Sequence, residues 1–189
     1  MRKNFKDIGF YPQPVLVVGT YDEAGVPNAM NVGWGGMVGS RWVEINISKG
    51  HKTTENLEKT KAFTMSFATR DHLEQADYVG LVSGREKPDK IAAAGLHPVK
   101  GQAVNAPIFE EFPFALECRV AEMAPGYGGV RVVGEVLNVS ADESVLGPDG
   151  LVDADRAAFL SFDRVRRVYR VLGGAVGQAY HDGGKLMGE

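Results

Sequence analysis

Cysteine is almost absent from this sequence, because Cys118 is the one cysteine among 189 residues. A lone cysteine excludes an internal disulfide and a metal site built from several thiolates. It also fits a reducing compartment. The first ten residues carry charges throughout and lack the apolar centre of a signal peptide. We therefore expect a cytoplasmic protein.

The sequence also lacks long hydrophobic runs and long runs of residues with one sign of charge. No apolar run approaches the roughly 20 residues that a membrane helix needs, so we expect no membrane segment. The formal net charge is -3, with acidic and basic residues interspersed, so no basic surface is expected to attract nucleic acid. The hydrophobic fraction of 44% is ordinary for a globular protein. The length predicts a single domain over residues 1–189.

The usual catalytic motifs are not found. The sequence has no glycine-flanked serine elbow and no Gly-x-Gly-x-x-Gly turn in a β-α-β setting. Cys118 lies on the apolar side of a strand pattern, which predicts a buried, inert thiol. The four histidines have no metal-ligand spacing: His51, His72, His97 and His181. We therefore predict neither a metal ligand nor a catalytic side chain.

Short apolar runs that alternate with polar residues dominate the chain, and a period of two indicates half-buried strands. The predicted strands are Val15–Tyr21, Asn28–Val38, Trp42–Ser48, Phe63–Ala68, Phe114–Val120, Val130–Ser140 and Tyr169–Leu172. The predicted helices are Thr53–Thr60, with a threonine as cap, Asp71–Val82, Pro88–Ala94 and Asp153–Leu160. This pattern predicts a mainly β protein with a barrel core and a few peripheral helices.

The segment Gly50–Asn56 follows a predicted strand and opens a predicted helix. A helix start exposes unpaired N–H groups and the positive end of the helix dipole, which attract anions. Lys52 adds a full positive charge, and Thr53 and Thr54 add hydroxyl donors. These groups fit a phosphate monoester. An ordinary helix cap with a solvated lysine explains the same residues.

Two further stretches have residues suited to a ligand. Residues 28–35 combine asparagine amides, glycines and Trp34, a set that allows a flat ring to lie against the backbone. The alternative is a glycine-rich barrel strand with a core tryptophan. Residues 83–90 form a charged loop that enters a helix. That loop either contacts a ligand or a second subunit, or it is a solvated surface.

In this order the stretches resemble the flavin reductase-like family of FMN-binding split β-barrels, which includes flavoredoxin. The resemblance covers residues 11–179. It rests on Pro14–Thr20 with Asn28-Ala29-Met30 and Trp34; Ile47-Ser48 with His51–Asn56; Ser83-Gly84 with Asp89-Lys90; and Gly134-Glu135-Val136 with Tyr169 and Leu172-Gly173.

The resemblance implies a Greek-key split barrel built as a homodimer, with FMN near the subunit interface. It places three groups of residues around the cofactor: Asn28, Ala29, Met30, Asn31 and Trp34 beside the flavin ring; Ser48, Lys52, Thr53 and Thr54 on the phosphate and ribityl side; and Ser83 and Gly84 on a loop near the pocket.

The implied function is an FMN-dependent oxidoreductase that passes electrons from NAD(P)H or a protein redox partner to an acceptor. The alternative is a non-enzymatic FMN-binding or electron-carrier module without NAD(P)H activity. One departure from the family bears on this choice, since many relatives have a histidine where this chain has Gly129. If that histidine helps to bind the nicotinamide, its loss argues against NAD(P)H as the donor.

Overall fold

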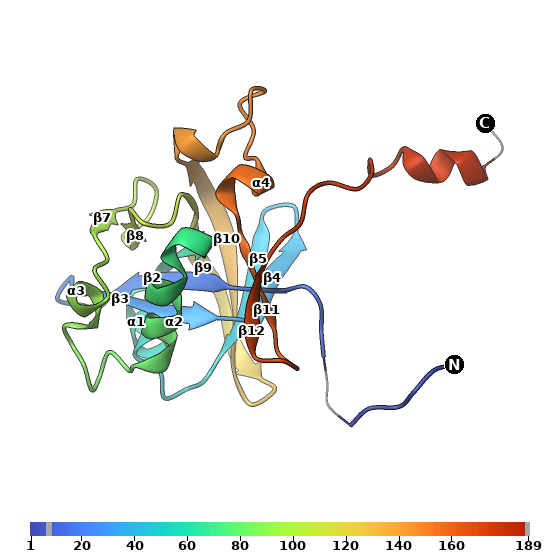
Figure 1. Cartoon of the computed structure of the whole chain (residues 1–189). Coiled ribbons are helices and arrows are strands. Elements are labelled where there is room, and N and C mark those ends of the chain that lie inside the picture. The colour runs from blue at the N-terminus through green and yellow to red at the C-terminus, as the bar shows by residue number, and fades with distance from the viewer. Residues whose placement is uncertain (7–8, 188–189) are drawn as a thin grey trace.

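The largest element of the fold is a seven-stranded antiparallel sheet in the order β3-β2-β6-β9-β10-β5-β4 (Figure 1). The structure is a computed structural model that describes residues 1–6 and 9–187. The strands of this sheet are β2 (Leu16–Tyr21), β3 (Pro27–Val32), β4 (Gly35–Gly39), β5 (Trp42–Ile47), β6 (Ala62–Phe67), β9 (Phe114–Gly126) and β10 (Gly129–Ala141).

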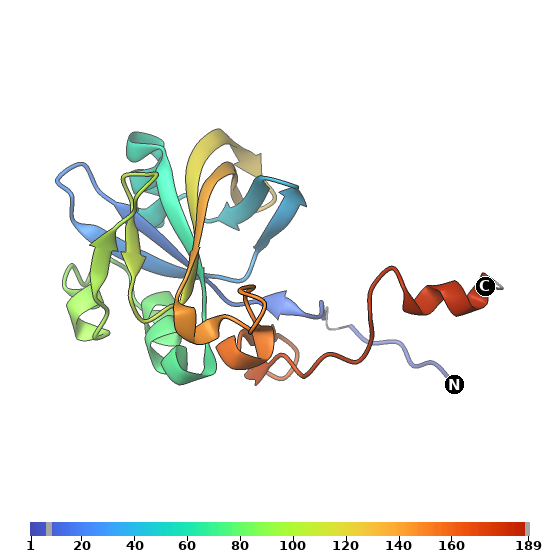
Figure 2. The ribbon, with the colours of Figure 1, turned by 90° about the horizontal axis from the view of Figure 1, so that it is seen from above.

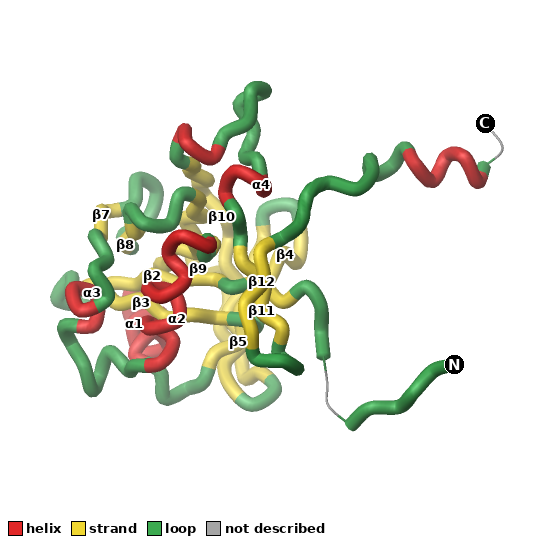
Figure 3. The backbone as a smooth tube through the Cα atoms, viewed as in Figure 1, coloured by secondary structure: helices red, strands yellow, loops and turns green. Residues whose placement is uncertain are grey.

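Two smaller sheets and several short helices surround this sheet (Figure 3). One small sheet has the order β1-β11-β12, with β1 at Gln13–Pro14, β11 at Leu160–Asp163 and β12 at Val168–Val171. The other pairs β7 (Pro98–Lys100) with β8 (Pro107–Phe109). The α-helices are α1 (Lys52–Thr60), α2 (Leu73–Leu81), α3 (Lys90–Ala93) and α4 (Ala154–Ala157), and 3-10 turns lie at Arg70–His72, Glu143–Val145 and Asp182–Leu186. The predicted mainly β class is confirmed.

Strand β2 is buried on both faces, which explains why its sequence is apolar rather than alternating. Successive side chains of a strand point to opposite sides. Leu16 and Val18 therefore pack with Phe63 in the barrel interior, whereas Val17 packs with Val79 beneath α2. The helix layer on the outer face of β2 and β3 thus has an apolar base that fixes the position of α2.

The prediction of one strand over Asn28–Val38 is wrong. The chain leaves β3 after Val32 and starts β4 at Gly35, which pairs with β5 instead of β2. A Cβ atom on Gly35 would lie 2.8 Å from Cγ2 of Ile45 and 2.9 Å from the carbonyl oxygen of Glu44. Glycine therefore permits this close crossing, and β3 and β4 become the two edges of the seven-stranded sheet.

Three predicted helix boundaries are also wrong. Helix α1 is preceded by His51 rather than by a capping threonine, and no side chain caps it. The helix predicted at Pro88–Ala94 begins only at Lys90. The helix predicted at Asp153–Leu160 ends early, because Ala158 is left-handed with φ of 49° and Leu160 starts β11.

A fully buried carboxylate connects the loop after β7 to the sheet. Glu117 on β9 accepts hydrogen bonds from the N–H groups of Ala103 (2.7 Å) and Val104 (3.2 Å) and from Nδ2 of Asn138 (2.8 Å). Burial opposes ionisation of this carboxyl, but the hydrogen bonds from Asn138 and the loop outweigh it and lower the pKa of Glu117. The carboxylate thus anchors a loop that has little regular structure of its own.

The segment after β12 extends away from the sheets in two perpendicular views (Figure 1 and Figure 2). Its apolar side chains Val176 and Tyr180 are fully exposed. Within residues 1–6 and 9–187, no helix has the length and apolar character to cross a membrane.

Candidate functional site

A cavity of about 230 Å³, here called the polar cavity, opens between β3, the start of α1 and the end of α2. Most of its walls carry hydrogen-bond donors or backbone groups. It is lined by Asn28, Met30, Asn31, His51, Lys52, Thr53, Val79, Gly80, Leu81, Val82, Ser83, Gly84 and Lys90. Residues from four separate segments of the chain therefore meet at one site.

The start of α1 gives the polar cavity its anion-binding character. His51, Lys52 and Thr53 at the start of this nine-residue helix line the cavity. No side chain caps the helix, so its positive dipole end lies at the cavity without a protein anion as its cap. Lys52 Nζ lies 2.9 Å from Glu55 Oε1, and Arg85 lies 2.9 Å from the other oxygen of the same carboxylate. The hydrogen bond from Lys52 and the nearby cations lower the pKa of Glu55. Glu55 thus positions two cations at the cavity rim.

Lys90 adds a buried cation that the sequence analysis did not identify as a site residue. Its side chain is 3% exposed, and Nζ donates to the carbonyl oxygens of Val79 (3.2 Å) and Val82 (3.0 Å) at the end of α2. Burial lowers the pKa of Lys90 to about 8. Burial and the charge of Lys90 also lower the pKa of His51. The signal in the sequence was the charged loop of residues 83–90, which ends at Lys90 and also fits a solvated surface.

Asn28 and Gly84 form a close contact in the polar cavity. Nδ2 of Asn28 donates to Oγ1 of Thr53 over 2.9 Å. Oδ1 of Asn28 is buried, and no hydrogen-bond partner for it exists among the described residues. A Cβ atom on Gly84 would lie 2.5 Å from this oxygen. Glycine therefore lets the loop approach an acceptor that remains available to a ligand.

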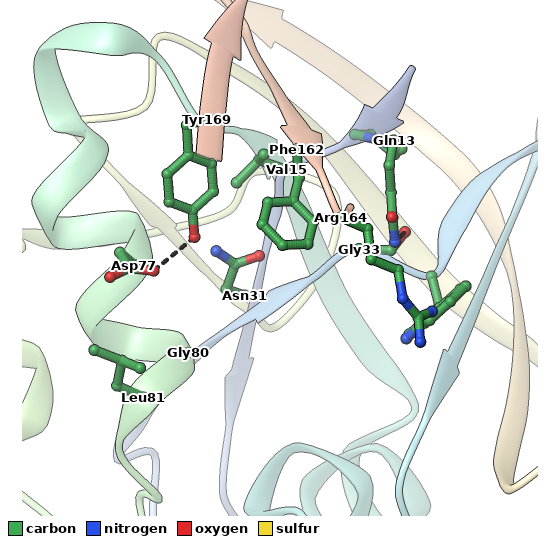
Figure 4. Close-up of a pocket in the computed structure, with 12 residues that line it drawn as sticks. Gln13, Val15, Asn31, Gly33, Asp77, Gly80, Leu81, Phe162, Arg164 and Tyr169 are labelled. Carbon is green, nitrogen blue, oxygen red and sulfur yellow. Dashed lines mark hydrogen bonds between the residues drawn. The ribbon is translucent and has the colours of Figure 1, made fainter. Parts of the chain in front are cut away.

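A second cavity of about 440 Å³, here called the aromatic cavity, adjoins the first (Figure 4). It lies between β3, α2 and the small sheet of β1, β11 and β12. Its lining residues are Gln13, Pro14, Val15, Asn31, Gly33, Trp34, Asp77, Gly80, Leu81, Phe162, Arg164 and Tyr169. The two cavities share Asn31, Gly80 and Leu81. They therefore provide one extended site with a polar end and an aromatic end.

The wall of the aromatic cavity is held by long-range polar contacts. Tyr169 OH donates to Oδ1 of Asp77 over 2.6 Å (Figure 4), and burial together with this carboxylate raises the pKa of Tyr169 above its usual range. Nδ2 of Asn31 donates to the carbonyl oxygen of Ala76 on α2. The guanidinium of Arg164 lies 4.9 Å from the ring centre of Trp34. Neither Asp77 nor Arg164 belonged to any motif in the sequence.

The structure brings most of the predicted site residues together. Those that line the polar cavity are Asn28, Met30, Asn31, Lys52, Thr53, Ser83 and Gly84. Trp34 lines the aromatic cavity and is 56% exposed, so the alternative of a core tryptophan is wrong. Ala29, Ser48 and Thr54 line neither cavity. Ala29 packs in the apolar cluster beneath α2, and Thr54 Oγ1 donates to the carbonyl oxygen of Ser48 over 2.7 Å.

Gly129 is the first residue of β10, directly after the β9-β10 turn, and it lines neither cavity. A Cβ atom there would collide with the carbonyl oxygen of Ile47 and lie 3.0 Å from Oδ1 of Asn46. This backbone path therefore has no room for a histidine at position 129.

Neither a reactive thiol nor a metal cluster accompanies the cavities. Cys118 is fully buried, and burial raises the pKa of its thiol to about 12. In the part of the chain that the structure describes, no three His, Cys, Asp or Glu side chains gather as a metal site.

Comparison with known proteins gives consistent matches. Residues 8–159 match the model of the flavin reductase like domain. The structure of flavoredoxin from Desulfovibrio vulgaris (Miyazaki F) is 34% identical, with a TM-score of 0.91 over 97% of this chain and 100% of that chain. Flavoredoxin from Methanosarcina acetivorans is 26% identical, with a TM-score of 0.89 over 99% of each chain. The protein YdfE of Bacillus subtilis (strain 168) is 23% identical, over 94% of each chain.

Proposed function

The chain belongs to the flavin reductase-like family, and we propose that it is an FMN-dependent oxidoreductase that passes electrons from a donor through bound FMN to an acceptor. The predicted split-barrel fold is confirmed by this membership. Bound FMN supplies the redox chemistry, and the protein supplies binding, orientation and electrostatics. The observation that carries the proposal is the pair of adjoining cavities, which share Asn31, Gly80 and Leu81.

The polar cavity fits the phosphate and ribityl parts of FMN. The uncapped start of α1, Lys52 and the buried Lys90 provide the positive potential that a phosphate monoester requires. Oδ1 of Asn28, which is buried without a partner among the described residues, is an acceptor for a ribityl hydroxyl. An unmatched buried acceptor costs free energy, so a hydroxyl donor at this place stabilises the complex.

The aromatic cavity fits the flavin ring. Trp34, Phe162 and Tyr169 provide flat walls. Strand β3 is an edge strand, so half of its backbone N–H and C=O groups have no strand partner and are free to bond a ring with polar edges. On this proposal Asn31 lies where the ribityl chain joins the ring.

Assembly as a homodimer is part of the proposal, and one surface supports it. Strand β4 is the other edge of the sheet, and its side chains Met37 and Val38 are exposed and line one surface hollow together with Trp34. A contiguous exposed apolar surface of this kind marks a contact face. The family resemblance places the cofactor near such an interface.

The decisive experiment is an absorbance spectrum of the purified protein, followed by anaerobic addition of NADH and of NADPH. Bound FMN that is bleached by either nucleotide supports the oxidoreductase. FMN that is bleached by dithionite but by neither nucleotide supports the alternative of an electron carrier, which Gly129 and the likeness to flavoredoxin favour. A protein that binds no FMN contradicts both functions.

Lys52→Ala is expected to weaken FMN binding about tenfold, since a hydrogen bond to a charged group contributes about 1.5–3 kcal/mol and solvent screens part of it. Lys52 is partly exposed and already contacts Glu55, so the lower end of that range applies. Quenching of FMN fluorescence in a titration measures the change.

The matched control for this substitution is Lys59→Ala. Lys59 lies on the same helix and pairs with Glu23, but it does not line the polar cavity. Equal affinities in the Lys52 and Lys59 variants would show that the start of α1 does not hold the phosphate.

A further inference from the structure

Two side chains of opposite charge line different parts of the aromatic cavity. They are Asp77 and Arg164, and in Figure 4 the side chains of Asn31 and Phe162 lie between them. Arg164 is exposed and lies 4.9 Å from the ring centre of Trp34, so water and salt screen its charge. Asp77 is half-buried, so its charge acts on the cavity more strongly than that of a solvated group. Asp77 therefore has the larger electrostatic effect on a molecule in this cavity.

The hydrogen bond between Tyr169 and Asp77 determines where the charge of this pair lies. Tyr169 OH on β12 donates to Oδ1 of Asp77 on α2 over 2.6 Å. Burial and the carboxylate raise the pKa of Tyr169 above its usual range, so the tyrosine keeps its proton. The negative charge of the pair therefore stays on Asp77, at the wall of the cavity.

Close packing of α2 against β3 fixes the position of Asp77. Nδ2 of Asn31 on β3 donates over 3.1 Å to the carbonyl oxygen of Ala76, the residue before Asp77. One turn further along α2, a Cβ atom on Gly80 would lie 2.9 Å from Cβ of Asn31, an approach that glycine permits. A charge held on a rigid wall acts on a bound group without having to reorganise first.

We propose that Asp77 lowers the reduction potential of FMN bound in the aromatic cavity, so that the protein holds a stronger reductant. The inference rests on the proposed function, because it requires the flavin ring in this cavity. A flavin that takes up two electrons and one proton gains one negative charge. The carboxylate of Asp77 repels that charge, whereas it has little effect on the neutral ring of oxidised FMN. The protein therefore binds reduced FMN less tightly than it would without Asp77, and the potential falls.

The reduction potential of FMN bound to Asp77→Asn tests this inference. The side-chain oxygen of asparagine can still accept the hydrogen bond from Tyr169, so the wall is kept while the charge is lost. We expect the affinity for reduced FMN, relative to that for oxidised FMN, to rise about tenfold, which raises the potential of a two-electron couple by about 30 mV. Asp77→Ser, a smaller uncharged variant, is expected to show the same rise. Spectroelectrochemical titration in slightly alkaline buffer, where reduced flavin is an anion, measures the potential.

Two variants serve as controls for charge and for packing. Glu74→Gln removes an equal charge from the same helix, but Glu74 is exposed and lines neither the polar nor the aromatic cavity. We expect this variant to keep the potential of the parent. Asp77→Glu keeps the charge at the cavity wall, so its potential is also expected to stay close to that of the parent.

Fluorescence titration with oxidised FMN, together with the potentials, distinguishes the outcomes. A raised potential in Asp77→Asn supports the inference, and an unchanged affinity for oxidised FMN locates the effect in the reduced form. An unchanged potential in Asp77→Asn, or an equal rise in Glu74→Gln, overturns the inference and leaves the FMN site intact. An equal rise in Asp77→Glu also overturns it, because packing rather than charge would then set the potential. A parent protein that binds no FMN overturns the proposed function itself, and this inference with it.

Discussion

Glu117→Ala is expected to lower the free energy of unfolding by about 3–5 kcal/mol, because each buried donor left without an acceptor costs about 1–3 kcal/mol. The N–H groups of Ala103 and Val104 and the amide of Asn138 all lose their acceptor together. Since domains are stable by only about 5–15 kcal/mol, this is a large fraction of the total. Urea denaturation of the FMN-free protein, followed by tryptophan fluorescence, measures it without ligand linkage.

Glu117→Gln is the conservative control and is expected to lose less, because its side-chain oxygen in the place of Oε2 still accepts the two hydrogen bonds from Ala103 and Val104. The pKa of Glu117 is lowered in the folded state, so its contribution to stability is present above the unfolded pKa of about 4.3. That contribution is lost as the pH falls through the folded pKa. Glu117→Gln is expected to lack this part of the acid dependence. An alanine variant as stable as the parent would contradict the anchoring role.

The barrel strands could be predicted because their pattern is local. Val43, Ile45 and Ile47 are buried on one side of β5, as the alternation over Trp42–Ser48 indicates. The strands β7, β8 and β11 are three or four residues long, which is too short for a period of two to be recognised. The break between β3 and β4 depends on the fit of Gly35 against Ile45, a tertiary contact that no local pattern encodes.

The two cavities differ in how far the sequence predicts them. The polar cavity draws its donors from short contiguous segments, the start of α1 and the start of β3, so the residue types at each segment already indicate an anion. The aromatic cavity is closed by Tyr169 and Asp77, which are 92 residues apart. Only packing of the small sheet against α2 brings them together.

Lys90 was not predicted as a cavity residue for another reason. A lysine in a charged loop is usually solvated, and the burial of this one appears only in the folded chain.

Lys90→Met is expected to weaken FMN binding by about ten- to one-hundredfold, since a charged hydrogen bond is worth about 1.5–3 kcal/mol. The effect should exceed that of Lys52→Ala, because Lys90 is buried and buried charges are screened less by water and salt. Methionine fills a similar volume, so the cavity shape is preserved. Lys90→Arg is the control that keeps the charge. Fluorescence titration at pH 7 gives both affinities, and equal binding by the methionine variant and the parent would contradict the role of this cation.

The pH dependence of FMN affinity separates the charge of Lys90 from its packing. Burial lowers the pKa of Lys90 from 10.5 to about 8. Between these pH values the unfolded chain holds a proton on Lys90 that the folded protein has lost. Lys90 therefore makes the free energy of unfolding rise with pH in that window. A phosphate dianion favours the protonated lysine, so FMN binding should be level between about pH 7 and 8, above the second phosphate pKa near 6. Above pH 8 the affinity should fall by up to about tenfold per pH unit, as linkage to one proton requires. Lys90→Met should remove this decline while keeping its lower affinity throughout. A decline that persists in the methionine variant would assign the titration to another group and leave Lys90 a structural role at the end of α2.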